Sequence, residues 1–294
     1  MRIAHATDIH WFLRPSLSRL LGKRLLGTAN LYLRGRRHHF TRQVQDALVA
    51  HIVELNPDLV IVTGDLTAQA LPEEFSLAKE QLNPVLKRFP TVLMPGNHDA
   101  YTGGSIRDKR MLHYFKRWMY LQDGPVGRLD EGAVTVLTLD PTRAHFSASG
   151  LIPLDQLNAL RTLLSSDELT TQTVILALHY PLLSRSGQVY DGADHGLRNA
   201  SDLIALLDSC PVKPAAILHG HRHHGYRVDL PLSGVNVPIF NPGAGGYAWL
   251  PSHDRTGAMN LYTTAPNGDI AVERYLFDGQ RFSPEEGGSY ATGR

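Results

Sequence analysis

The stretch DLVIVTGD, at residues 58–65, joins a short apolar run to a glycine and an acidic residue. An aliphatic run that is closed off in this way is typical of a buried strand. The preceding residues 40–55 repeat apolar side chains at helical spacing and place Val44, Leu48 and Ile52 on one face. Asn56 ends this helix, because the proline after it disfavours the helical conformation. A helix that leads into a buried strand predicts an α/β protein with helices packed on a partly parallel sheet.

Apolar runs and helical stretches alternate along most of the chain. We expect strands at residues 2–7, 58–63, 90–94, 133–139, 173–178 and 215–218, and helices at 40–55, 72–89, 105–121, 154–164 and 199–209. Shorter runs separated by Gly, Pro and Asn predict closing antiparallel strands at 226–228, 235–240, 258–263 and 270–275. No low-complexity linker divides the chain, so we expect a single domain over residues 1–294 with a loose tail from about residue 283.

The composition excludes several classes of protein. A hydrophobic content of 43% with 19% charged residues excludes a wholly disordered chain. The single cysteine, Cys210, excludes an internal disulfide and a cysteine-based zinc site. No apolar run reaches the roughly 18 residues that span a bilayer, and no signal peptide is recognisable. We therefore expect a cytoplasmic protein.

A basic, leucine-rich insertion at about residues 14–37 departs from the near-neutral balance of the chain. Between Ile9 and Gln45 there is no Asp or Glu, and the basic residues are Arg14, Arg19, Lys23, Arg24, Arg34, Arg36, Arg37 and Arg42. Such a segment suits peripheral binding to an anionic membrane surface, on the inner face of the membrane. Two alternatives stay open: the leucines pack on the core or on a second subunit, or the arginines steer anionic substrates.

Residue types that bind metals follow five of the predicted strands. They are Asp8, His10, Asp65, Asn97, His179, His221 and His223. The carboxyl ends of strands in an α/β sheet are where ligands bind, so these side chains should meet at one edge. Oxygen and imidazole donors without a thiolate suit borderline to hard divalent cations. Seven donors are too many for one catalytic ion with an open position and fit two ions that share a carboxylate.

These motifs, in order over residues 8–223, resemble the calcineurin-like metallophosphoesterase superfamily. They read Asp8-x-His10, Gly64-Asp65, Gly96-Asn97-His98-Asp99, His179 and Gly220-His221-x-His223. The resemblance implies a four-layer α/β/β/α sandwich with mixed sheets. It also implies a binuclear centre in which Asp8, His10, Asp65 and His223 hold one ion, and Asp65, Asn97, His179 and His221 hold the other. Asp65 would then bridge two divalent ions, with manganese, iron and zinc all compatible with these donors.

The resemblance further implies that a hydroxide between the ions attacks a phosphate ester while His98 protonates the leaving group. Asp99 either supports His98 or is a surface carboxylate after a turn. Asn97 is also placed to contact the substrate. His195 and Arg198 either form a cationic lip for an anionic substrate or belong to an ordinary solvated loop.

The sequence therefore predicts a metal-dependent phosphodiesterase, and it is similar to the bacterial class III cyclic nucleotide phosphodiesterases. The first alternative is a peripheral-membrane pyrophosphatase on a nucleotide–lipid precursor, similar to the UDP-diacylglucosamine hydrolases. The non-enzyme alternative is a metal-free scaffold of the same fold. The predicted partner is a phosphate-ester substrate, with no specific nucleic-acid partner, and an oligomer is compatible with the sequence.

Overall fold

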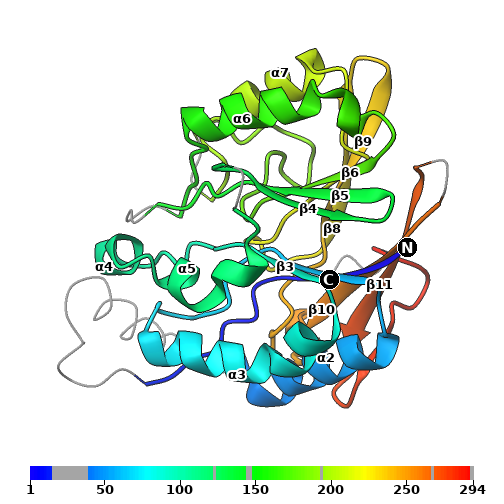
Figure 1. Cartoon of the computed structure of the whole chain (residues 1–294). Coiled ribbons are helices and arrows are strands. Elements are labelled where there is room, and N and C mark those ends of the chain that lie inside the picture. Colours follow the sequence, from blue (N-terminus) through cyan, green and yellow to red (C-terminus); the bar gives the residue numbers. More distant parts are fainter. Residues whose placement is uncertain (15–38, 122–123, 144–147, 193–194, 266–267, 292–294) are drawn as a thin grey trace.

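Two mixed sheets lie face to face at the centre of the computed structural model (Figure 1). The structure describes residues 1–14, 39–121, 124–143, 148–192, 195–265 and 268–291. Most of the basic insertion expected at 14–37 therefore lies outside the described residues. None of the helices in the described ranges is long and apolar enough to cross a membrane.

The first sheet has six strands in the order β12-β11-β10-β1-β2-β3. They are β1 (Arg2–Ala6), β2 (Leu59–Val62), β3 (Thr91–Leu93), β10 (Ala258–Thr264), β11 (Ile270–Phe277) and β12 (Phe282–Pro284). β1, β2 and β3 are parallel, and β10, β11 and β12 continue the sheet in antiparallel pairs beside β1. The parallel half of this sheet carries the first three polar motifs at its carboxyl ends.

The second sheet has six strands in the order β4-β5-β6-β7-β9-β8. They are β4 (Gly127–Glu131), β5 (Val134–Thr138), β6 (Thr173–Ala177), β7 (Ala216–Leu218), β8 (Tyr226–Leu232) and β9 (Val235–Asn241). β5, β6, β7 and β9 are parallel, and the two edge strands are antiparallel to their neighbours. The four closing strands are thus divided into one hairpin for each sheet, and β9 runs parallel to its inner neighbour β7.

Helices cover the outer face of each sheet, which confirms the four-layer α/β/β/α fold. α2 (Arg42–Leu55) and α3 (Pro72–Arg88) lie on the first sheet, and α6 (Leu154–Leu164) and α7 (Ala200–Ser209) lie on the second (Figure 1). The remaining helices are short: α4 (Gly103–Arg107), α5 (Arg110–Phe115), and the 3-10 turns η3 (Lys116–Trp118), η4 (Asp167–Leu169) and η5 (Pro251–His253).

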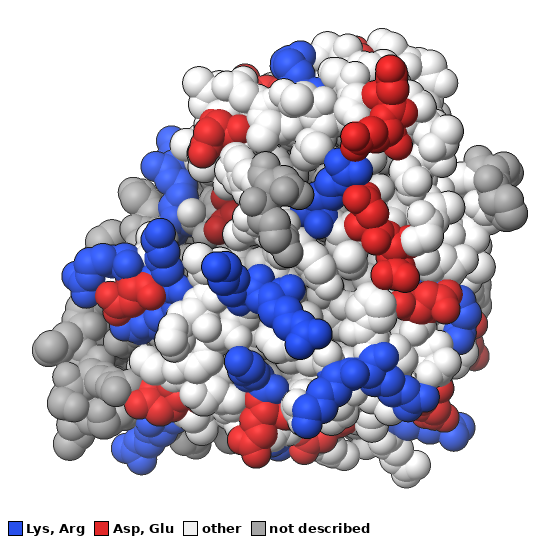
Figure 2. Space-filling model, viewed as in Figure 1, with Lys and Arg blue, Asp and Glu red and all other residues white. Residues whose placement is uncertain are grey.

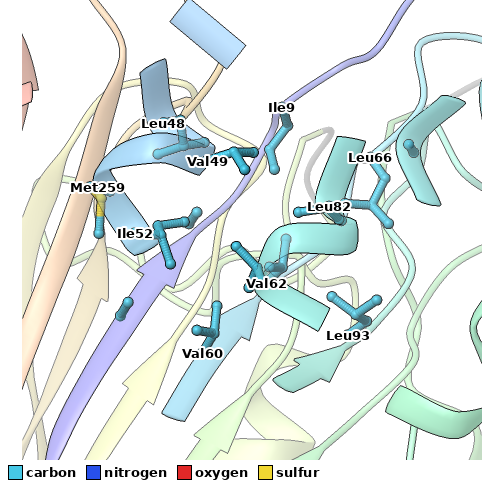
Figure 3. Packing of buried hydrophobic residues seen from close by; sticks show 14 of the residues in the cluster. Ile9, Leu48, Val49, Ile52, Val60, Val62, Leu66, Leu82, Leu93 and Met259 are labelled. Carbon is cyan, nitrogen blue, oxygen red and sulfur yellow. The ribbon is translucent and has the colours of Figure 1, made fainter. Parts of the chain in front are cut away.

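Apolar side chains fill three layers. Leu48 and Ile52 of α2 pack against Val60 and Val62 of β2 in the outer core of the first sheet (Figure 3). Side chains alternate along a strand, so Leu59 and Ile61 point the other way and contact the second sheet. The core between the sheets fixes their faces together, and it thereby sets how far apart their carboxyl ends lie.

Two expectations about the elements are wrong, and two strands were not foreseen. Residues 105–121 do not form one helix, because Lys109 adopts a left-handed φ of 47° between α4 and α5. β4 and β12 were not predicted. The residues from 283 onward are not a loose tail over their described length. β12 pairs with β11, and the buried Glu285 forms a 3.1 Å ion pair with the buried Arg274.

Charged side chains are unevenly distributed. Figure 2 shows Lys and Arg gathered on one face over α3, α4 and α5, while Asp and Glu run in a line beside the second sheet. The basic residues from the start of α3 to the end of η3, at residues 72–118, are Lys79, Lys87, Arg88, Arg107, Lys109, Arg110, Lys116 and Arg117.

Candidate metal centre

The polar motifs meet where the carboxyl ends of the two sheets come together. The loops after β1, β2 and β3 bring Asp8, His10, Asp65 and Asn97 from the first sheet, and the loops after β6 and β7 bring His179, His221 and His223 from the second. Each sheet supplies only part of the group. The structure therefore brings all seven expected ligands to one place.

Asp65 lies at the middle of this group. Its Oδ1 accepts a 2.7 Å hydrogen bond from the backbone N–H of His98. Its Oδ2 is 3.6 Å from His10 Nε2 and 3.4 Å from His179 Nε2. Burial alone would raise the pKa of Asp65, but the neighbouring His179 and His98 hold it below its usual value. One oxygen of this carboxylate is thus fixed by the protein, and the other faces two separate sets of donors.

The two carboxylate oxygens of Asp8 also have different surroundings. Its Oδ2 accepts hydrogen bonds of 2.8 Å from the hydroxyl of Thr7 and 2.8 Å from the backbone N–H of His221. Its Oδ1 is buried without a hydrogen-bond partner among the described residues. This oxygen lies 3.3 Å from His223 Nε2 and 3.7 Å from His10 Nε2. The donor atoms of Asp8, His10, Asp65 and His223 all lie within 4.8 Å of one another.

A second set of donors lies on the other side of Asp65. Asn97 Oδ1 is 3.0 Å from His179 Nε2 and 2.7 Å from His221 Nδ1. His179 Nδ1 donates a 2.7 Å hydrogen bond to the carbonyl of Thr63, because a carbonyl can only accept. This bond turns Nε2 toward Asp65 and Asn97, as the outer hydrogen bond of a metal-binding histidine does.

The two sets fit divalent cations. Four ligands at about 2.1 Å from an ion are about 3.4 Å from one another in a tetrahedron, which is close to the donor separations found here. Although burial lowers it, the Asp65 carboxylate raises the pKa of His179 to about 9, so a positive charge is favoured between these side chains. A bound cation would account for the unpaired Oδ1 atom of Asp8 and for the histidine ring nitrogens that converge on it. The assignment of each side chain to a particular ion stays a prediction.

The backbone at this centre is strained. Asp8, His10, Asp65, His221 and His223 have φ values of 51°, 55°, 55°, 70° and 49°, in the left-handed region that non-glycine residues rarely adopt. Each such residue costs on the order of 1–3 kcal/mol and persists only where the surroundings impose it. These turns aim side chains from adjacent positions in different directions, which allows short loops to supply several ligands.

A glycine allows two of these loops to touch. A Cβ on Gly64, whose φ is 95°, would lie 2.5 Å from the backbone nitrogen of Gly96. A side chain at either position would therefore separate the loop that carries Asp65 from the loop that carries Asn97.

His98 lies at the edge of the centre. Its Nδ1 donates a 2.6 Å hydrogen bond to the carbonyl of Ala68, and its ring contacts His10 edge-on at 4.6 Å and stacks on Tyr101 at 5.4 Å. Burial lowers the pKa of His98 to about 4. The neutral ring therefore has its proton on Nδ1 and a bare Nε2. Donation of a proton from Nε2 requires a charged ring, which a neighbouring phosphate anion would favour.

Asp99 corrects the sequence analysis, because it neither orients His98 nor lies on the surface. The buried carboxylate accepts hydrogen bonds from the backbone N–H groups of Leu66, Thr67 and Gly96 at 3.2, 2.9 and 3.0 Å. The hydroxyl of Thr67 donates a further bond of 2.9 Å. No hydrogen bond joins Asp99 to His98 among the described residues. Burial and the charge of Asp65 raise the pKa of Asp99 to about 6. Asp99 ties the loop after β2 to the loop after β3.

The two residues expected to form a cationic lip are placed differently. The exposed His195 has its ring centre 6.0 Å from that of His221, so it borders the centre. The exposed Arg198 is held through its backbone, whose N–H donates to Gly150 at 2.9 Å. Nothing in the described chain joins its side chain to the centre.

Phe40 and Thr7 also belong to this site, although neither was predicted from the sequence. Phe40 packs against His10 at 4.3 Å and against His223 at 5.4 Å, and its ring also contacts Tyr247 at 5.3 Å. It shields two candidate ligands from water. Thr7 could have been noticed as a hydroxyl directly before Asp8, but Phe40 follows the basic segment without any pattern that connects it to the metal motifs.

Comparison with known proteins agrees with this geometry. The model of the calcineurin-like phosphoesterase family matches residues 1–225. A 3′,5′-cyclic-nucleotide phosphodiesterase of Nostoc sp. is 29% identical over 76% of this chain and 72% of its own. A glycerophosphodiester phosphodiesterase of Enterobacter lignolyticus is 28% identical over 57% of this chain and 56% of its own. The structure of a purple acid phosphatase from yellow lupin matches 96% of this chain and 52% of its own, with a TM-score of 0.61 at 14% identity.

The site and the fold define a metal-dependent phosphoric ester hydrolase, of a kind that uses two metal ions. The chain belongs to the calcineurin-like phosphoesterase family.

Proposed function

We propose that this protein is a binuclear metal-dependent phosphodiesterase, with cyclic nucleotides as the favoured substrate class. The observation that carries the proposal is the single Oδ2 atom of Asp65, which faces His10 at 3.6 Å and His179 at 3.4 Å. A phosphodiester is anionic and repels a nucleophile, so a site for its hydrolysis must concentrate positive charge. Donor atoms on both sides of one carboxylate meet this need with two cations.

The residues fit a division of labour. Asp8, His10 and His223 would hold one cation, Asn97, His179 and His221 would hold the other, and Asp65 would contact both. When bound, the two divalent cations supply acidity for water and positive charge for the phosphoryl oxygens. Manganese, iron and zinc all suit these donors, and the availability of each metal in the cell weighs heavily in the choice among them.

His98 is suited to assist the departure of the alcohol. Its Nδ1 is engaged by the carbonyl of Ala68, so the free Nε2 is the atom that can act on the substrate. A phosphate beside the ring would favour its charged form, and Nε2 could then pass a proton to the leaving oxygen. Asn97 directly precedes His98 in the loop after β3, and its side-chain amide is a candidate contact for the substrate.

The substrate class is supported by relatives at low identity. The Nostoc relative is named for 3′,5′-cyclic nucleotides and the Enterobacter relative for glycerophosphodiesters, so a diester is common to both names. A second candidate is a pyrophosphatase acting on a nucleotide–lipid precursor. The basic side chains over α3, α4 and α5 favour it, because they suit an anionic lipid surface (Figure 2).

A substrate panel tests the proposal. Protein reconstituted separately with manganese, iron or zinc would be given 3′,5′-cyclic AMP, bis(4-nitrophenyl) phosphate, a glycerophosphodiester and a nucleotide–sugar lipid. We expect hydrolysis of diesters that is lost when the metals are chelated. Faster cleavage of the pyrophosphate bond than of any diester would support the second candidate. Purified protein that takes up no metal and hydrolyses nothing would be the metal-free scaffold.

A further inference from the structure

A hollow of about 430 Å³ lies beside the metal centre. One wall is the loop of residues 184–190 and the other is residues 222–226, which lead from the loop after β7 into β8. Its lining includes Ser184, Arg185, Tyr190, Arg222, His224 and Tyr226. We call this hollow the arginine pocket. It shares no lining residue with the donor sets of the centre, so the proposed reaction leaves it unexplained.

The loop after β7 serves both sites. His221 and His223 have left-handed φ values of 70° and 49°. Their side chains reach Asn97 and Asp8, as described above, whereas the intervening Arg222 and the following His224 line the arginine pocket. Alternate side chains of one short segment therefore face two adjacent places. A molecule that spans both would contact this segment from each side.

The arginine pocket is positively charged and has no counterion in the described chain. Arg185 and Arg222 line it, and no carboxylate does. Neither arginine forms an ion pair with a described residue. A third arginine, Arg255, approaches His224 at 3.3 Å and donates to the hydroxyl of Tyr247 at 3.0 Å. Guanidinium groups that gather without carboxylates repel one another, and a bound anion removes that cost.

The walls are organised before any ligand arrives. Tyr190 lies beneath the guanidinium of Arg222, at 6.0 Å from its ring centre. Tyr226 donates a 2.9 Å hydrogen bond to the carbonyl of Leu183, which fixes its ring. The 184–188 turn is closed by a 2.8 Å bond from Ser184 N–H to the carbonyl of Gln188. The guanidinium of Arg222, held over Tyr190 in this way, suits the several oxygens of a phosphate.

We propose that the arginine pocket binds a second phosphate group of the substrate while the scissile diester lies at the metal centre. This inference rests on the proposed phosphodiesterase activity and revises its substrate class. A 3′,5′-cyclic nucleotide has one phosphate, whereas this pocket favours diesters that have a second phosphate beyond the bond that is cut. Arg185 and Arg222 are then residues that determine specificity.

Matched dinucleotides test the proposal. Thymidylyl-(3′→5′)-thymidine contains one diester, and versions with an added 5′- or 3′-terminal phosphate contain the same diester and a second anion. We expect wild-type protein to prefer one of the phosphorylated versions through a lower KM. Arg185→Gln should reduce that preference by about 10-fold or more, which is typical of a lost hydrogen bond to a charged group. Arg185→Lys should retain part of it.

Arg185 is exposed, so its substitution should leave the fold intact. Arg161→Gln is the matched control, because Arg161 is exposed on α6 and its side chain bonds only the hydroxyl of Ser209 in the described chain. It should keep the wild-type ratio of kcat/KM values. An equal ratio for the two kinds of dinucleotide in wild-type protein, or a ratio unchanged by Arg185→Gln, would overturn the proposal.

A binding measurement separates this inference from the proposed function. Thymidine 3′,5′-bisphosphate and thymidine 5′-monophosphate would be titrated into metal-loaded protein by calorimetry. We expect the bisphosphate to bind more tightly and Arg185→Gln to remove most of the difference. If no diester of the substrate panel is hydrolysed, the proposed function fails, and this titration still tests whether the arginine pocket binds a second phosphate. Inorganic phosphate that binds as tightly as the bisphosphate would identify a free-phosphate site and overturn the role in substrate binding.

Discussion

The Oδ1 atom of Asp65 accepts a 2.7 Å hydrogen bond from the backbone N–H of His98, so the carboxylate cannot rotate to offer both oxygens to one cation. The bond also fixes the position of His98 relative to the bridge. The proposed bridging ligand and the proposed proton donor are thus placed by a single contact, and the predictions for the two residues differ.

Asp65→Ala should lose both metal occupancy and nearly all activity. The variant removes an atom that faces both His10 and His179, and the histidines are left without the anion that favours a cation between them. Metal content measured by inductively coupled plasma mass spectrometry, beside turnover, checks this. Asp46→Ala is the control, because Asp46 is exposed on α2. Wild-type turnover with two ions bound to Asp65→Ala would disprove the bridge.

His98→Ala should keep both metal ions and lower turnover on substrates with poor leaving groups by about 10²–10⁴-fold, as expected when a general acid is lost. The loss should shrink for bis(4-nitrophenyl) phosphate, whose leaving group needs no proton. The ratio of the two losses is the measurement. Equal losses on both substrates would assign His98 to phosphate positioning.

Asp99→Asn should lower stability and metal affinity without a dependence on the leaving group. One oxygen of the carboxylate accepts bonds from the N–H groups of Leu66 and Gly96 and the other from that of Thr67, so an asparagine turns its NH₂ group toward at least one of these donors. A buried donor left unpaired costs about 1–3 kcal/mol. Thermal unfolding and metal titration measure the effect. If Asp99→Asn keeps the wild-type melting temperature but loses more turnover on substrates with poorer leaving groups, Asp99 has a catalytic role.

Part of this centre could be predicted because it follows from topology. Parallel strands end at one edge of a sheet, so the backbone topology alone places Asp8, Asp65 and Asn97 close together. Asp99 could not be predicted, since its partners are backbone N–H groups of a different loop and leave no pattern in the sequence. Lys109 breaks the helix predicted at 105–121 without a proline inside it. The burial of Glu285 depends on Arg274 across a strand pair formed only in the fold.

Glu74 should make the protein less stable as pH rises. Burial raises its pKa to about 7 from its ordinary value of 4.5, despite N–H bonds from Gln69, Leu71 and Leu13. The folded state holds the proton more tightly than the unfolded state, so the stabilisation is complete below pH 4.5 and is lost as pH rises through about 7. The change is about 3 kcal/mol.

Urea unfolding of wild type and Glu74→Gln between pH 4.5 and 7.5 checks this, because the variant should lack that part of the pH dependence. Glu80→Gln, at an exposed position of the same helix, should behave as wild type. Parallel curves for wild type and Glu74→Gln would show that the folded protein does not raise the pKa of Glu74.

Anionic liposomes should bind the protein at low salt and release it at high salt. Residues 14–37 are basic, and Arg107, Lys116 and Arg117 add to the described basic face. Each basic residue near such a surface contributes about 1 kcal/mol, which salt screens. Co-sedimentation measures the bound fraction, with neutral liposomes and Arg161→Gln as controls. If the protein stays in the supernatant with anionic liposomes at low salt, membrane binding is ruled out. The basic segment would then serve in packing or in the steering of anionic substrates.

The first sheet is completed late in the chain, which has a consequence for biosynthesis. β1 carries the first ligands at its end, but its other edge pairs only with Ala258–Thr264. A nascent chain that has emerged from the ribosome as far as His223 holds every candidate ligand, yet β1 still lacks this neighbour and the strands beyond it. The centre can acquire its final geometry only after β10 has been synthesised, so stable metal binding requires a polypeptide that extends past Thr264.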